Sequence, residues 1–293
     1  MSAPLSLRGS RPRWHTRNVD KPALSGLYIR SLGQGRSTLL MVHGGPEWDH
    51  SYLVPAAERL ASGRRVVLFD LRGCGRSFRC DRVEDYTRRA AAADVVAVAR
   101  SLEPPIDLLG FSFGGRLALL AAQMQPRLFR SLILASTSTR GHVTWDPEPA
   151  ERARRRRAVE DELSRLGPAE RAERTRRLAL ASLPLDVGDE EAIPRVRPAI
   201  EAIRFSDAWW QAYEGGGLAS EAPIDASWLA DSPLPVLVVH GERDYRFPAD
   251  DSAWLAGAPA VERALIEGAG HLAHLEAPER WNDAVASFLA RLD

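Results

Sequence analysis

Six short stretches of the chain are continuously apolar, rich in Val, Leu and Ile, and end in Gly, Ser or Asp. They cover residues 38–44, 64–70, 106–112, 131–136, 234–241 and 262–270. Continuous apolar stretches, as opposed to alternating ones, are typical of parallel strands that are covered on both faces. Residues 26–33 could form an earlier, antiparallel strand at the sheet edge. The pattern therefore predicts a mostly parallel central sheet.

Segments with a helical spacing of apolar residues lie between these stretches. They cover residues 52–62, 86–101, 115–125, 248–256 and 278–291. Strands that alternate with helices predict an α/β fold, with helices on both faces of the sheet. From residue 140 to residue 232 the patterns are helical only. We therefore expect residues 1–139 and 233–293 to form the α/β core, and residues 140–232 to form a helical cap over one end of the sheet.

The charges of the chain are balanced, with 39 basic and 39 acidic side chains among 293 residues. No overall field therefore favours binding to nucleic acid or to an anionic membrane. A run of four arginines, residues 154–157, stands between acidic residues at 151 and 160–162. This arrangement is typical of a solvated helix face, and we expect no nucleic-acid partner.

Membrane and export signals are missing from the sequence. No apolar run approaches the ~20 residues of a membrane helix, and the first twenty residues contain no signal-peptide core. The two cysteines, Cys74 and Cys80, are too few for a disulfide framework. We expect a cytoplasmic protein without a membrane partner; its oligomeric state is not encoded in any pattern that we can identify.

The segment LLGFSFGGRLALL (108–120) contains the pattern G-x-S-x-G at Gly110, Ser112 and Gly114. By itself this pattern is weak evidence, but here it follows an apolar strand and opens a helix, as a nucleophile elbow requires. In so tight a turn, side chains at Gly110 and Gly114 would collide with the crossing backbone. We expect Ser112 to be a catalytic nucleophile.

A serine nucleophile needs a base, and the base needs an orienting acid. In the elbow arrangement the order along the chain is Ser, then Asp or Glu, then His. Asp244 follows the strand at 234–241, and His271 follows the strand at 262–270. Both belong to the sheet edge at which the elbow presents its serine. The alternatives are Glu242, Asp250 or Asp251 for the acid and His274 for the base, although Asp250 and Asp251 resemble a helix start.

The reaction also needs hydrogen-bond donors for the developing oxyanion. One is the backbone N–H of the residue after the nucleophile, Phe113. The segment VHGGP (42–46) is suited to supply the other, because its glycines let the backbone approach a substrate carbonyl. We assign that donor to Gly45. No zinc-like ligand spacing is present, and we expect neither a metal nor a cofactor.

These motifs together resemble the α/β-hydrolase superfamily and, more narrowly, proline iminopeptidases and related microbial aminopeptidases. The resemblance covers essentially the whole chain. It rests on HGGPEWDHSYL (43–53), DLRGCGRS (70–77), GFSFGG (110–115), GERD (241–244) and GAGH (268–271). It implies an α/β-hydrolase fold with a helical cap inserted after the strand that follows the elbow helix. It also implies cleavage of an amide next to a free amino group.

In that family a glutamate of the cap, within a W-x-x-W-E-G-like segment, recognises the substrate's α-amino group. Trp210, Tyr213 and Glu214 resemble this segment, and they are the substrate-binding residues that the resemblance implies. The alternative is that Trp209, Trp210 and Tyr213 pack the cap on the core while Glu214 faces water. Glu47 stands where the family usually has a glycine and alters the mouth of the site. The second amine-binding carboxylate of the family has only Glu221 as a candidate.

The expected function is that of a serine hydrolase that removes an N-terminal aminoacyl group from a short peptide or a small-molecule amide with a free amino group. An esterase, thioesterase or lactonase with the same catalytic residues is the alternative. A binding protein that has lost catalysis is a third class, since fold does not dictate function. Such a chain usually lacks one catalytic residue, whereas this sequence has a candidate for each.

Overall fold

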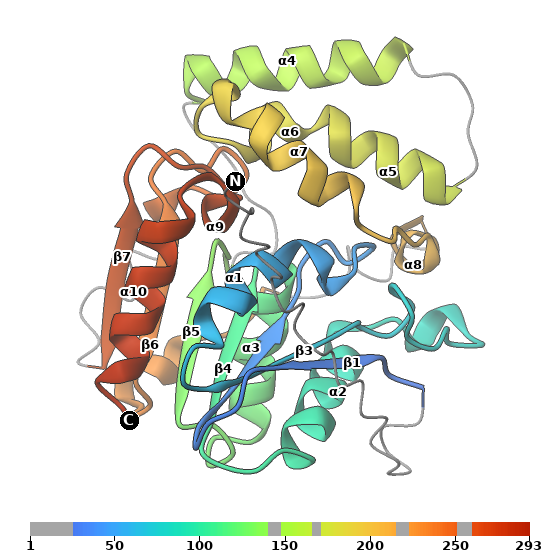
Figure 1. The fold of residues 1–293 in the computed structure, drawn as a ribbon. Helices are drawn as coiled ribbons and strands as arrows, with labels where there is room; N and C mark the ends of the chain where they lie inside the picture. Colours follow the sequence, from blue (N-terminus) through green and yellow to red (C-terminus); the bar gives the residue numbers. More distant parts are fainter. Residues whose placement is uncertain (1–25, 140–147, 166–170, 215–222, 251–259) are drawn as a thin grey trace, which may run out of the picture.

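The computed structural model describes residues 26–139, 148–165, 171–214, 223–250 and 260–293 (Figure 1). In this part of the chain, seven strands form one sheet in the order β1-β3-β2-β4-β5-β6-β7. The strands are β1 (Ile29–Leu32), β2 (Thr38–Val42), β3 (Arg65–Phe69), β4 (Ile106–Phe111), β5 (Ser131–Ala135), β6 (Val236–Gly241) and β7 (Val261–Ile266). Only the pairing of β1 with β3 is antiparallel. The expected mostly parallel sheet with an antiparallel edge strand is confirmed.

Helices cover both faces of this sheet, because strand residues alternate between the faces. Leu40 and Val42 of β2 pack with α2 (Arg88–Arg100) and α3 (Phe113–Met124). Leu39 and Met41 pack on the other face with α1 (Val54–Leu60) and α10 (Pro278–Ala290). Among the described residues, the core also contains the short α9 (Ala273–Glu276) and 3₁₀ helices over His50–Leu53 and Val83–Asp85.

Three sequence-based expectations differ from the structure or cannot be compared with it. The helix expected from residue 115 begins at Phe113, because the turn at Ser112 leads into it directly. The expectation that β7 is covered on both faces is wrong: Leu265 is 51% exposed, since β7 is an edge strand paired with β6. Most of the helix expected over 248–256 lies outside the described residues.

Between β5 and β6 the described residues form helices, which lie beyond the carboxyl ends of the central strands (Figure 1). They are α4 (Ala150–Arg165), α5 (Arg171–Ala181), α6 (Leu183–Asp186), α7 (Ile193–Glu201) and α8 (Ala208–Glu214), with 3₁₀ helices over Glu190–Ala192 and Ser227–Asp231. We call this part of the chain the helical segment. None of the helices that the structure describes is both long and apolar enough to cross a membrane.

The arginine run of α4 is only partly a solvated face. Arg154 is exposed and pairs with Glu151 at 2.8 Å. Arg155 is buried, and its guanidinium donates to the Val187 and Gly188 carbonyls at 2.6 and 3.0 Å. The expectation of a solvated face is therefore wrong for Arg155, because its guanidinium satisfies carbonyl groups beyond the end of α6 that would otherwise be buried without partners.

Candidate active site

Ser112 occupies a sharp turn between β4 and α3, and its φ of 54° is unusual for a residue with a side chain. Two glycines make this turn possible. A Cβ on Gly110 would lie 2.4 Å from the Gly114 carbonyl oxygen, and one on Gly114 would lie 2.3 Å from the Val42 carbonyl oxygen. The predicted collisions at both positions are confirmed. The turn presents the Ser112 side chain at the carboxyl end of β4.

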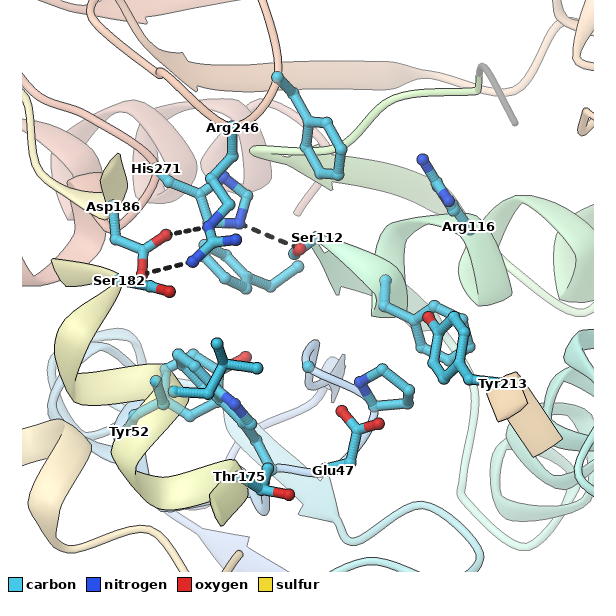
Figure 2. A pocket seen from close by; sticks show the side chains of 18 residues that line it. Glu47, Tyr52, Ser112, Arg116, Thr175, Ser182, Asp186, Tyr213, Arg246 and His271 are labelled. Atoms are coloured by element: carbon cyan, nitrogen blue, oxygen red, sulfur yellow. Dashed lines mark hydrogen bonds and ion pairs between the residues drawn. The ribbon is translucent and has the colours of Figure 1, made fainter. Parts of the chain in front are cut away.

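Three side chains from separate loops form a hydrogen-bonded row at this edge of the sheet. His271, which follows β7, has its Nε2 atom 3.0 Å from the Ser112 Oγ atom. Its Nδ1 atom lies 2.9 Å from Oδ2 of Asp244, which follows β6. Figure 2 shows the contact between His271 and Ser112. The row places the His271 imidazole, a proton acceptor, next to the Ser112 hydroxyl group. The Asp244 carboxylate lies on the other side of the imidazole.

The carboxylate of Asp244 is fully buried but well supplied with donors. Its Oδ1 atom accepts the backbone N–H groups of Arg246 and Phe247 at 2.8 and 2.9 Å. His240 Nε2 lies 3.0 Å from Oδ2. Burial by itself would raise the pKa of this carboxyl, but the charge of His271 and the hydrogen bonds from His240 and His271 hold the pKa well below its usual value. Asp244 therefore stays ionised behind the imidazole.

The alternative acids and the alternative base lie elsewhere. Glu242 and Asp250 are exposed, and Asp251 lies outside the described residues. His274 is completely buried among aromatic rings, and burial, followed by the charge of His271, lowers its pKa to about 3. A neutral, enclosed imidazole of this kind packs beside the row and is not part of it.

The loop after β2 is held by a chain of hydrogen bonds. The Leu71 N–H donates to Nε2 of His43 at 3.0 Å, so Nδ1 carries the proton and donates to the Gly44 carbonyl at 2.8 Å. Burial lowers the pKa of His43, which keeps the ring neutral as this arrangement requires. The Gly44 N–H donates in turn to the Tyr52 hydroxyl at 2.8 Å. The loop is thus fixed before any ligand arrives.

The same loop passes close to the nucleophile. A Cβ on Gly44 would lie 2.8 Å from the Cβ of Ser112, so only glycine fits there. Gly45 has a φ of 100°, and a Cβ on it would lie 2.5 Å from the Trp48 side chain. Gly45 and Phe113 both line the cavity in front of Ser112. Because the amide of Gly44 is already engaged, the assignment of an oxyanion donor to Gly45 stays the better prediction.

A cavity of about 330 Å³ opens in front of Ser112 and His271 (Figure 2). One wall belongs to the core loops. The opposite wall belongs to the helical segment and contains Thr175, Leu178, Ala179, Ser182 and Tyr213. Charged side chains that line the cavity are Glu47, Arg116, Asp186 and Arg246. The space can hold a small molecule or the end of a peptide between a reactive serine and a partly polar wall.

The residues expected to bind substrate are divided between the cavity and its surroundings. Glu47 and Tyr213 line the cavity. Trp210 is not part of the lining and lies under the guanidinium of Arg174, 5.6 Å from its ring centroid. Glu214, the last residue of α8, is exposed and is not part of the lining either. The other candidate carboxylate, at residue 221, lies outside the described part of the chain.

Trp209 attaches α8 to the core. Its side chain is completely buried, and its Nε1 atom donates to the Arg72 carbonyl at 2.8 Å. Its ring packs edge-on against Tyr86 and against Phe113, the residue after the nucleophile. For Trp209 the packing interpretation of the aromatic cluster is confirmed.

Two further cavity residues were missed by the sequence reasoning. Arg246 forms an ion pair with the buried Asp186, in which Nη2 and Oδ2 lie 3.1 Å apart (Figure 2). The pair joins the loop that carries Asp244 to the end of α6. Sixty positions separate the two residues, and no local pattern links them.

Glu276 is a third residue that was missed, and it positions the loop of the candidate base. Its two carboxylate oxygens accept the N–H groups of Gly188 and Gly270, each at 2.8 Å. Burial raises the pKa of Glu276 to about 7, against the effect of these hydrogen bonds. Gly270 directly precedes His271, and Gly188 belongs to the helical segment. Glu276 therefore holds the imidazole loop and the helical segment together.

The family model described as alpha/beta hydrolase fold matches residues 37–278. The chain belongs to the alpha/beta hydrolase fold family. A proline iminopeptidase of Levilactobacillus brevis is 29% identical to this hydrolase over 286 residues, which is 91% of this chain and 93% of the relative. A proline iminopeptidase from Lactobacillus delbrueckii subsp. bulgaricus is 28% identical over 91% of this chain and 95% of its own length.

Solved structures similar to this alpha/beta hydrolase are named for different activities. A proline iminopeptidase-related protein of Thermus thermophilus has a TM-score of 0.72 and 25% identity, covering 96% of this chain and 99% of its own. An esterase of Thermogutta terrifontis has a TM-score of 0.69 and 27% identity, covering 91% and 93%. The similarities support a hydrolase. The named relatives and structures differ in the bond that they cleave, since some are proline iminopeptidases or related to them and one is an esterase.

Proposed function

We propose that this alpha/beta hydrolase is a serine aminopeptidase that removes an N-terminal aminoacyl group from a peptide or a small-molecule amide. The observation that carries the proposal is the row of Ser112, His271 and Asp244, with distances of 3.0 and 2.9 Å, at the floor of a cavity of about 330 Å³. Residues 140–232 would act as the cap that covers this cavity.

In the proposed reaction, Ser112 Oγ attacks the carbonyl carbon while His271 Nε2 takes its proton. Asp244 holds the imidazole in the tautomer that accepts at Nε2 and stabilises the imidazolium that forms. The N–H groups of Gly45 and Phe113 donate to the oxyanion, and each such donor contributes ~10²–10³ in rate. His271 then protonates the leaving amine. Water repeats the sequence on the acyl-enzyme and releases the acid.

The choice of an aminoacyl substrate rests on the curated relatives named above, which are proline iminopeptidases. The cavity is compatible with that class, since a carboxylate, Glu47, and an aromatic side chain, Tyr213, stand in its wall. A positively charged amino group that leaves water needs such a carboxylate, and aromatic neighbours strengthen the attraction. The acyl group itself is left open.

Ester hydrolysis is the second candidate, because an esterase is among the similar structures at 27% identity. The same three residues would catalyse it, and no amino group would be needed. The position of Glu214 outside the cavity lining favours this alternative in part.

A panel of substrates separates the two candidates. Aminoacyl anilides with free amines, the same anilides with acetylated amines, and simple esters of matched acyl size are compared by kcat/KM. The aminopeptidase proposal expects free-amine anilides to exceed acetylated ones by at least ~10-fold. Turnover of esters only, or equal turnover of free and acetylated anilides, would reject it. Reaction of Ser112 with a fluorophosphonate probe tests catalysis itself, and a failure to react would indicate a binding protein.

A further inference from the structure

Two carboxylates line the cavity, and only one of them has a charged partner among the described residues. Asp186 is neutralised by Arg246. Glu47 is different, because its Oε1 atom is buried and has no hydrogen-bond partner in the described part of the chain. Figure 2 shows its carboxylate pointing into the same cavity as Ser112 and His271.

Glu47 is buried, on a loop whose backbone is held by hydrogen bonds. The residue is 8% exposed. Its carbonyl accepts the Ser206 N–H at 2.9 Å, and the Cys74 thiol donates to the carbonyl of Pro46, the preceding residue. These contacts hold the backbone of the loop in place at Glu47. A buried carboxylate without a partner costs several kcal/mol if it is ionised, so such a group is usually paired with a ligand or kept protonated.

Among the cavity residues that the structure describes, none forms an ion pair with Glu47. The ionisable groups nearby are Cys74 behind the loop and, around the cavity, Tyr52, Arg116, Asp186, Tyr213, Arg246 and His271. Of the two guanidinium groups, Arg116 donates to the Ser138 carbonyl at 2.9 Å and Arg246 pairs with Asp186. Burial raises the pKa of Glu47 to about 7, and its own backbone N–H offsets only part of the rise. The carboxyl is thus ready to ionise when a cation enters the cavity.

We propose that Glu47 binds the ammonium group of the substrate's acyl part, in the place that the family resemblance gives to Glu214. The inference rests on the aminopeptidase function proposed above and names the residue that selects its substrates. Acyl groups that carry a primary or secondary ammonium would be accepted, with Oε1 of Glu47 as an acceptor. Tyr213, which lines the same cavity, and Trp48, beside Glu47, form the aromatic walls. The exposed carboxylate of Glu214 competes poorly, since water screens it.

The test is the ratio of kcat/KM for a free-amine alanine anilide to that for its N-acetyl form. Glu47→Gln removes the charge and should lower this ratio roughly 10- to 100-fold, the rate equivalent of a charge-assisted hydrogen bond. Glu47→Asp should recover part of it. Glu214→Gln should change the ratio less than about 3-fold. Glu58→Gln, at an exposed position on α1 outside the cavity, is the matched control.

The outcomes distinguish this inference from the proposed function. A wild-type preference for free amines that Glu47→Gln abolishes supports both. A wild-type preference that survives in Glu47→Gln, or that is lost in Glu214→Gln, overturns the role of Glu47 and leaves the aminopeptidase function standing. A wild-type enzyme that shows no preference rejects both. Equal rates of fluorophosphonate labelling of Ser112 in all variants show that they are folded.

A second measurement does not depend on the folding of Glu47→Gln. Alaninamide is titrated into Ser112→Ala by calorimetry at pH 7 in buffers of different ionisation enthalpy. Because Glu47 has a pKa near 7 before binding, its pairing with an ammonium group should release about half a proton. Equal affinities of Ser112→Ala for alaninamide and for N-acetylalaninamide would overturn the inference.

Discussion

The two walls of the cavity are built differently. On the core wall, Ser112 and His271 follow strands of one sheet, and hydrogen bonds of 2.9–3.0 Å connect them and Asp244. The wall from the helical segment is mostly apolar or weakly polar, and it is attached to the core through single contacts such as the Trp209 indole. Strand ends in one sheet hold reacting atoms at fixed distances, whereas packed helices shape the space. We infer that the core wall sets the reaction and that the helical wall, together with Glu47, sets the substrate.

The largest expected effect comes from the core wall. Ser112→Ala should lower kcat by ~10⁴–10⁶ for every substrate that is cleaved, because nucleophile and base act as a unit. Ser182→Ala is the matched control, since Ser182 is a serine of the same cavity on the helical wall. It should change kcat/KM less than about 5-fold. Steady-state kinetics on anilides and esters measures both, and comparable losses in the two variants would contradict the division of roles.

The attachment of the helical wall can be broken at Trp209. Trp209→Ala should lower the free energy of unfolding by about 3–5 kcal/mol, because a completely buried indole and its hydrogen bond to Arg72 are lost. Trp210→Ala, next in the sequence, should lose about 1 kcal/mol, since that ring is partly exposed and has mainly the cation–π contact with Arg174. Urea unfolding followed by circular dichroism measures both. Equal losses of unfolding free energy in the two variants would show that α8 is not anchored mainly through the face that carries Trp209.

The stability cost of Glu47 should depend on pH. Burial raises the pKa of Glu47 from 4.5 to about 7, so the folded state holds this proton more tightly than the unfolded state. The contribution that protonated Glu47 makes to the free energy of unfolding is therefore complete below pH 4.5 and is lost as the pH rises to 7. The free energy of unfolding of Glu47→Gln, relative to that of the wild type, should rise by about 3 kcal/mol between about pH 4.5 and about pH 8. Urea unfolding at each pH measures this difference. The difference should be flat for Glu58→Gln, and a flat difference for Glu47→Gln would mean that the native carboxyl is already ionised.

The sheet and the row at its edge could be predicted because their signals are local. Apolar runs mark the strands, and glycines at 110 and 114 mark the turn at Ser112. The chain order of Asp244 and His271 then points to one edge of the sheet. The catalytic roles of Ser112, Asp244 and His271 remain predictions.

The helical wall could not be predicted in the same way, because its faces are decided by tertiary packing. Trp209 and Trp210 are neighbours in the sequence, yet one is buried in the core interface and the other is partly exposed. Arg155 looks like its charged neighbours but is buried among carbonyl groups. The pair of Asp186 and Arg246 spans sixty positions. None of these contacts leaves a periodic signal.

The smallest expected effect concerns the shape of the helical wall. Tyr213→Ala removes an aromatic side chain from the cavity lining without touching the row. It should raise KM about 3-fold for free-amine anilides and change kcat by less than about 2-fold, since an exposed contact between an aromatic ring and an ammonium group contributes ~0.5–1 kcal/mol. Gln211→Ala is the matched control, because Gln211 is an exposed residue of α8 outside the lining.

Comparison of several substrates shows whether Tyr213 affects binding or the reaction. If the helical wall shapes only the space for the substrate, the effect of Tyr213→Ala on KM should be larger for free-amine anilides than for N-acetyl anilides. The effect of Ser112→Ala should not vary, because it removes the reacting atom itself. An effect of Tyr213→Ala on kcat that is the same for free-amine and N-acetyl anilides would place this tyrosine functionally with the core wall. The helical wall would then take part in the reaction as well as in the choice of substrate.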